Sequence, residues 1–95
     1  MKCSQIASFL EEIAPLDLAE DWDNVGLMLG SMSTEVNRLM VCLDVTSKVV
    51  DEAINRKADM IVSHHPLLFR PLRRIETDNH KGALIFRLIK SGISV

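Results

Sequence analysis

The 95-residue chain has no tyrosine, one tryptophan and three phenylalanines, so aromatic side chains are scarce. Its two cysteines, Cys3 and Cys42, are too few for a disulfide framework, and we expect both to be reduced thiols of a cytoplasmic protein. No apolar run approaches the roughly 18–20 residues of a membrane span. The start MKCSQIASFLEEIA becomes acidic early and lacks a long apolar core. The sequence therefore predicts neither a signal peptide nor a membrane-bound protein.

The chain also lacks an excess of positive charge, since 11 Lys and Arg stand against 13 Asp and Glu. Proteins that bind nucleic acid directly need clustered basic residues, so we do not expect that activity. The one basic cluster is Arg70, Arg73 and Arg74, which can contact a phosphate but is more often a solvated loop. The apolar content of 47% is ordinary for one small globular domain.

The first third of the chain predicts a helix and an ordered loop. Ser4 is a candidate helix N-cap, and Pro15 ends the helical pattern. The residues expected on the buried face have helical spacing: Ile6, Phe9, Leu10 and Ile13. We interpret residues 17–30 as a loop that leads into a short strand, with Trp22 fixed in the core. The alternative is that this loop forms the rim of an active cleft.

The rest of the chain alternates strands and helices. Continuous apolar runs at 39–43 and 60–63 predict strands buried on both faces. Thr46 or Ser47 is expected to cap the intervening helix, whose predicted buried stripe comprises Val49, Val50, Ala53 and Ile54. A third helix is expected to start at Asp78 or Asn79 and to end at Ser91-Gly92. Its predicted buried face comprises Leu84, Ile85, Leu88 and Ile89.

This alternation predicts an α/β fold with a mostly parallel sheet flanked by helices. Residues 93–95 would begin another strand, yet strands average about 5–6 residues. We therefore expect residues 1–95 to be the amino-terminal part of a first α/β domain, truncated within an element.

Two of the three histidines, His64 and His65, follow the second apolar run directly. Ligands of parallel α/β sheets bind beyond the carboxyl ends of the strands, where this pair is expected. Pro66 biases His65 toward an extended conformation. Neighbouring imidazoles that diverge at a strand end can each bind one ion of a metal pair about 3.5–4 Å apart. A hydrogen-bonded surface pair is the alternative.

Among other candidate ligands, Asp44 is placed best because it ends the neighbouring strand, although capping the next helix is its alternative role. Five further side chains are less well placed: Asp21, Asp23, Glu76, Asp78 and His80. His80 is expected to be exposed at a helix start. Cys42 is expected in the core.

Three segments in this order, EDWDNVGLMLG, LMVCLDVT and ADMIVSHHPLLFRPL, resemble the start of the Nif-three-like dinuclear metal-centre family. Its bacterial members are often called GTP cyclohydrolase I type 2 homologues. The resemblance covers essentially all 95 residues. It implies a two-domain α/β protein in a toroidal hexamer, with two divalent ions per complete subunit (zinc, iron, manganese or nickel).

The resemblance further implies that His64 and His65 each bind one metal. The aspartate, histidine and glutamate that complete the family's site have no counterpart in these residues. Asp44 is not among the implied ligands, which leaves it to support a ligand or to cap a helix.

Two functions follow from the resemblance. The first is a metal-dependent hydrolase that opens the purine ring of GTP or acts on a related small molecule. The alternative is a non-catalytic metal-binding or regulatory scaffold. Because two imidazoles cannot fill two coordination spheres, we expect the 95-residue chain alone to bind metal weakly and to be inactive.

Overall fold

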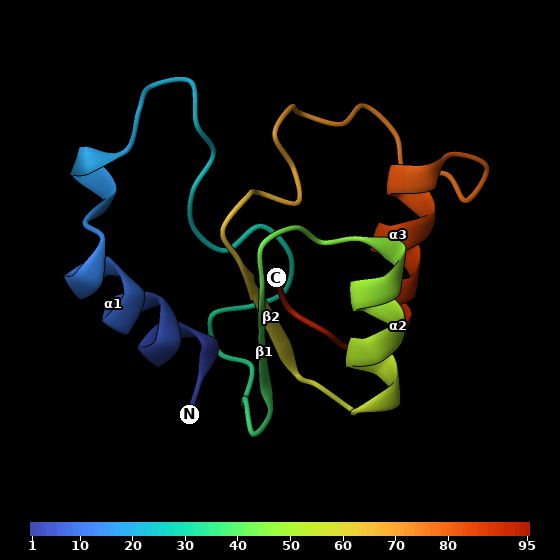
Figure 1. Ribbon diagram of the computed structural model, residues 1–95, viewed down its shortest axis with the longest axis horizontal. Helices are drawn as coiled ribbons and strands as arrows, with labels where there is room; N and C mark the ends of the chain where they lie inside the picture. Colours follow the sequence, from blue (N-terminus) through green and yellow to red (C-terminus); the bar gives the residue numbers. More distant parts are fainter.

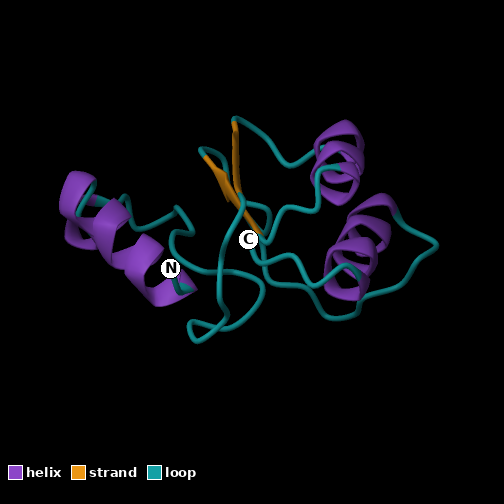
Figure 2. Ribbon diagram, turned by 90° about the horizontal axis from the view of Figure 1, so that it is seen from below, coloured by secondary structure: helices purple, strands orange, loops and turns teal.

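The computed structural model describes all 95 residues and has an α/β architecture (Figure 1). Its elements in chain order are α1 (Cys3–Ile13), the 3₁₀ helix η1 (Leu16–Leu18), β1 (Leu39–Cys42), α2 (Ser47–Asn55), β2 (Met60–Ser63) and α3 (His80–Lys90). Helix α1 lies on one side of the strands, and α2 and α3 lie on the other (Figure 2). The predicted fold class is confirmed. None of the helices has the length and apolar character that crossing a membrane requires.

Strands β1 and β2 pair in parallel, in a register that runs from Leu39 opposite Met60 to Cys42 opposite Ser63. The last residues of the chain continue this sheet on the other side of β2. Ser94 forms a parallel bridge with Met60, and the Ile61 N–H donates to the Ser94 carbonyl at 2.8 Å. Strand β2 is therefore central, and β1 lies at the edge of the sheet.

Alternate residues of β2 enter two separate cores, as the pleat requires. Ile61 is fully buried in the larger core, which α2 and α3 supply with Val50, Ala53, Leu84 and Leu88, among others. Met60 lies in a smaller core on the opposite face with Cys3, Ile6 and Val36. Both faces of the central strand are thus covered.

The expectation that β1 is buried on both faces is wrong. Leu39 and Val41 are exposed, Val41 at 72%, although their neighbours Met40 and Cys42 pack against the larger core. Helix α1 covers the Met60 face of β2 and leaves the adjacent face of β1 open. An apolar run does not distinguish a central strand from an edge strand.

Two predicted helix faces also need correction. Of the α1 stripe only Ile6 is buried, joined by Cys3, whereas Phe9, Leu10 and Ile13 are exposed. In α3, Ile89 is 55% exposed because α2 and the sheet cover the face that carries Leu84, Ile85 and Leu88. In α2, Val50 and Ala53 are buried as expected, and Val49 and Ile54 pack partly against the same core.

The predicted caps of the second and third helices are confirmed. Thr46 accepts from the Val49 N–H at 3.2 Å, and Asn79 accepts from the Gly82 N–H at 2.7 Å. Gly92, with a φ of 68°, follows the end of α3.

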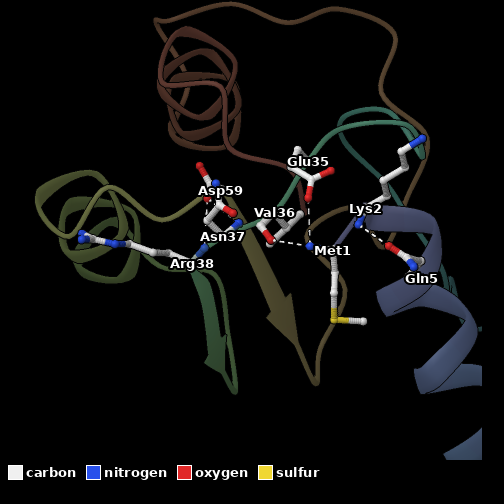
Figure 3. A network of polar contacts seen from close by, with 8 residues as sticks. All are labelled: Met1, Lys2, Gln5, Glu35, Val36, Asn37, Arg38 and Asp59. Atoms are coloured by element: carbon white, nitrogen blue, oxygen red, sulfur yellow. Dashed lines mark hydrogen bonds and ion pairs between the residues drawn. The ribbon is translucent and has the colours of Figure 1, made fainter.

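The predicted Ser4 cap of α1 is wrong, because Lys2 is the N-cap. The N–H groups of Cys3 and Ser4 instead donate, each at 2.9 Å, to loop carbonyls of Thr34 and Met32. A neighbouring backbone thus replaces the side-chain cap that Ser4 would supply. Figure 3 shows the adjoining contacts, in which the Met1 amino group lies 3.0 Å from a Glu35 carboxylate oxygen.

A carboxylate ties the starts of the two strands together (Figure 3). Asp59 accepts from the backbone N–H groups of Asn37 at 2.8 Å and Arg38 at 2.9 Å. These two hydrogen bonds to the charged form lower the pKa of Asp59. Because the strands begin level and have equal length, they also end level.

Two glycines allow close backbone packing. A Cβ added at Gly82, in the first turn of α3, would lie 2.9 Å from the backbone carbon and nitrogen of Glu76. A Cβ added at Gly30, which has a φ of 114°, would lie 2.8 Å from the Cβ of Ser94. At both glycines, the missing side chain lets a loop pack directly against a helix or the end of the sheet.

Candidate functional site

The two histidines lie immediately beyond the carboxyl ends of the paired strands, as predicted. The His64 N–H donates to the Cys42 carbonyl at 3.1 Å, and the His65 N–H donates to the Leu43 carbonyl at 2.9 Å. The Ser63 hydroxyl donates to the His65 carbonyl at 2.7 Å. Hydrogen bonds from the sheet therefore fix the backbone of both histidines.

The imidazole rings are exposed and lie edge to face. Their centroids are 5.0 Å apart and their planes are inclined by 73°. On His65, Nδ1 lies 2.7 Å from a carboxylate oxygen of Asp44. We call Asp44, His64 and His65 the histidine edge.

The contact with Asp44 bears both on the orientation of the His65 ring and on which of its nitrogens can bind a metal. A neutral imidazole that donates its Nδ1 proton to a carboxylate keeps the Nε2 lone pair free to bind a metal. The prediction that the two strand ends bring Asp44 and a histidine together is thus confirmed. Both side chains are about half exposed, so the contact itself adds little to stability.

The other candidate ligands do not join the histidine edge. No three His, Cys, Asp or Glu side chains in the chain form a cluster that could hold a metal ion. His80 is the first residue of α3 and is exposed, as expected. Cys42 is free and only partly buried, although it packs against the larger core. Burial, and then the negative charge of Asp44, raise the pKa of the Cys42 thiol, which disfavours the thiolate that binds metals.

The donor set fits part of a divalent metal site. Two imidazoles and one carboxylate are ligand types that zinc, iron, manganese and nickel accept. Two ions would require more donors than two imidazoles, one of them oriented by Asp44, provide. The histidine edge is therefore a portion of a site for a metal pair.

The predicted burial of Trp22 is wrong, because its side chain is 68% exposed. It faces the ring of Phe69, which follows the histidine pair, with the ring centroids 6.2 Å apart. The loop is held instead by Asn24, whose side-chain amide donates to the Leu68 carbonyl at 2.5 Å. The sequence around Trp22 does not show whether the tryptophan or the nearby Asn24 holds the loop in place.

The short strand expected near residue 30 is also absent. Met28 and Leu29 form hydrogen bonds with Val95 at 2.9–3.1 Å but do not belong to a strand. The tryptophan loop, residues 17–30, is thereby joined to the last residue of the chain, which continues the sheet beside β2.

Comparisons with known proteins agree with this architecture. The chain is 44% identical over 91 residues to the "GTP cyclohydrolase 1 type 2 homolog" of Listeria monocytogenes, covering 96% of this chain and 24% of that protein. It superposes with a TM-score of 0.93 on Staphylococcus aureus protein SA1388, at 38% identity, covering 99% of this chain and 30% of that one. It superposes on a Bacillus cereus protein related to NIF3 with a TM-score of 0.93, at 40% identity, covering 99% of this chain and 26% of that one.

The chain thus spans about a quarter to a third of the length of its curated relatives. The model of one family, described as Duf34/NIF3 (NGG1p interacting factor 3), matches residues 1–95. The chain belongs to the Duf34/NIF3 family.

Proposed function

We propose that this chain supplies the first ligands of a dinuclear metal centre in a GTP cyclohydrolase 1 type 2-like hydrolase, with His64 and His65 binding one ion each. The observation that carries the proposal is the pair of exposed, mutually inclined imidazoles at the joint end of two parallel strands. Ring centroids 5.0 Å apart are compatible with ions about 3.5–4 Å apart. The name of these relatives supports the substrate class.

In this proposal each residue has a defined task. When bound, the ions would lower the pKa of a coordinated water and polarise the substrate. His64 and His65 bind, and Asp44 accepts the Nδ1 proton of His65 so that Nε2 points its lone pair outward. The backbone bonds to Cys42 and Leu43 keep both imidazoles on the strand ends.

A homo-oligomer of the toroidal, hexameric kind and a cytoplasmic location belong to the same proposal. Many large apolar side chains are exposed on the single chain, including Phe9, Ile13, Leu18 and Val41, and such surface favours association. Two free cysteines favour a reducing compartment.

The test is metal binding and turnover in a chimera in which the 91 aligned residues of this chain replace the matching segment of the Listeria relative. His64→Ala and His65→Ala should each remove metal, measured by mass spectrometry, and should abolish formate release from GTP. His80→Ala is the matched control, because this exposed imidazole contacts neither histidine. Full metal content in both His64→Ala and His65→Ala would refute the proposal.

The same experiment separates the alternative function. Metal that depends on His64 and His65, without turnover of GTP, would favour a non-catalytic metal-binding or regulatory scaffold. The 95-residue chain alone should bind Co²⁺ weakly, since two imidazoles leave positions open in each coordination sphere.

A further inference from the structure

Two of the four aromatic side chains, Trp22 and Phe69, meet outside both cores. Their planes are inclined by 54° with centroids 6.2 Å apart, and they are 68% and 52% exposed. Aromatic rings stabilise folds mainly through the large apolar area that they bury. At these exposures the pair contributes little to folding, so its position points to another role.

The pair lies beside the histidine edge. Phe69 follows His65 by four residues, which an extended backbone spans in at most about 14 Å. The bond from Asn24 to the Leu68 carbonyl brings the tryptophan loop to the same place. In Figure 1 both loops lie toward the top, the side at which β1 and β2 finish.

The two loops carry opposite charges. Glu20, Asp21 and Asp23 flank Trp22, whereas Arg70, Arg73 and Arg74 follow Phe69. No ion pair joins these two groups, and the arginines' single partner is Glu76, 3.7 Å from Arg74. All three arginines are exposed. Their charges thus remain available to an anionic ligand next to an aromatic surface.

We propose that Trp22 and Phe69 form a stacking surface for the purine base of a nucleotide whose phosphates contact Arg70, Arg73 and Arg74. An aromatic face accepts any planar heterocycle, and guanidinium groups bind phosphate oxygens in a bidentate manner. The carboxylates around Trp22 accept N–H groups of a base edge and repel phosphate, which orients the ligand. The inference rests on the proposed function in taking a nucleotide as ligand, but it requires no metal.

The sole tryptophan makes the test direct, because any change in emission comes from Trp22. GTP added to the metal-free 95-residue chain should quench this emission saturably. Inorganic triphosphate and ribose 5-phosphate, which lack a base, should not. Phe69→Leu should weaken GTP binding about 5- to 150-fold, the range that corresponds to loss of one stacking partner. Phe86→Leu is the matched control on α3, where Phe86 is 46% exposed.

The phosphate contacts are tested separately. Arg70→Gln should weaken GTP but leave guanosine unchanged, and the exposed Arg56 at the opposite end of the sheet provides the control Arg56→Gln. Circular dichroism verifies that each surface variant is folded. Absent quenching by GTP, or equal affinity in wild type and Phe69→Leu, overturns the inference.

These outcomes are independent of the metal proposal. Metal binding that requires His64, without quenching by GTP, removes the stacking surface alone. Saturable quenching that Phe69→Leu weakens, together with a chimera that binds no metal, supports the stacking surface and removes the metal centre.

Discussion

Replacing Gly82 with alanine should destabilise the protein, contrary to the usual effect of this substitution in a helix. In an unconstrained helix interior, Gly→Ala gains about 1 kcal/mol. Here the new Cβ would lie 2.9 Å from two backbone atoms of Glu76 and closer still to its carbonyl oxygen. Backbone atoms cannot rotate away as a side chain does, so the loop before α3 must move.

The expected magnitude combines these opposing effects. Overpacking costs typically about 1–3 kcal/mol, and a rigid backbone contact belongs at the upper end of that range. After subtraction of the helix-propensity gain, Gly82→Ala should lower the free energy of unfolding by about 2 kcal/mol.

Urea denaturation followed by far-ultraviolet circular dichroism measures this change. Ala83→Gly, at the half-buried next position, calibrates the propensity effect and should cost about 1 kcal/mol. A gain in stability in Gly82→Ala would refute the assigned packing between α3 and the loop.

Three other predictions address the core, pH and the candidate site. Leu88→Ala should lower the urea-derived free energy of unfolding by about 2–5 kcal/mol because Leu88 is fully buried, whereas Ile89→Ala, at a 55% exposed neighbour, should change it far less. The folded-state pKa of Asp59 is lowered, so its stabilisation is present above the unfolded pKa of about 3.9 and is lost as pH falls through the folded value. Asp59→Asn should therefore flatten the acid side of a plot of urea midpoint against pH, and an unchanged slope would contradict this. Asp44→Asn should weaken Co²⁺ binding about 10- to 100-fold, measured by visible absorption, if Asp44 orients His65 for metal binding.

Local patterns in the sequence predicted most element boundaries. Strand β2 has the predicted bounds. Thr46 caps α2 and Asn79 caps α3, as predicted. These features depend on a few adjacent residues, which are visible in a sequence. The cap of α1 was missed because its first N–H groups bond to the backbone of residues 32 and 34, a distant partner that carries no side-chain signal.

Burial was predicted less well because it depends on which neighbouring element is present. Val41 and Ile89 have the hydrophobicity of core residues, yet no element in the structure covers them. Trp22 was expected in the core on hydrophobicity alone, whereas it packs against Phe69, 47 positions later in the numbering.

The location of the candidate site was predictable from topology. Parallel strands end at one edge, so Asp44 and the histidines were expected to meet, and Asp44 lies 2.7 Å from His65. The aromatic pair was not predictable, because it depends on how Asn24 attaches one loop to another. That contact leaves no periodic pattern in either segment.

The edge position of β1 has a practical consequence for work with this chain. Half of its backbone N–H and C=O groups face away from β2, beside the exposed Leu39 and Val41, and such an edge can template intermolecular β-pairing. The apolar run at residues 39–43 is bounded directly by the charged residues Arg38 and Asp44, which act as gatekeepers against aggregation. Neutralising Asp44 therefore changes colloidal behaviour as well as histidine chemistry, and its variants should be compared at dilute concentrations at which light scattering shows no multimers.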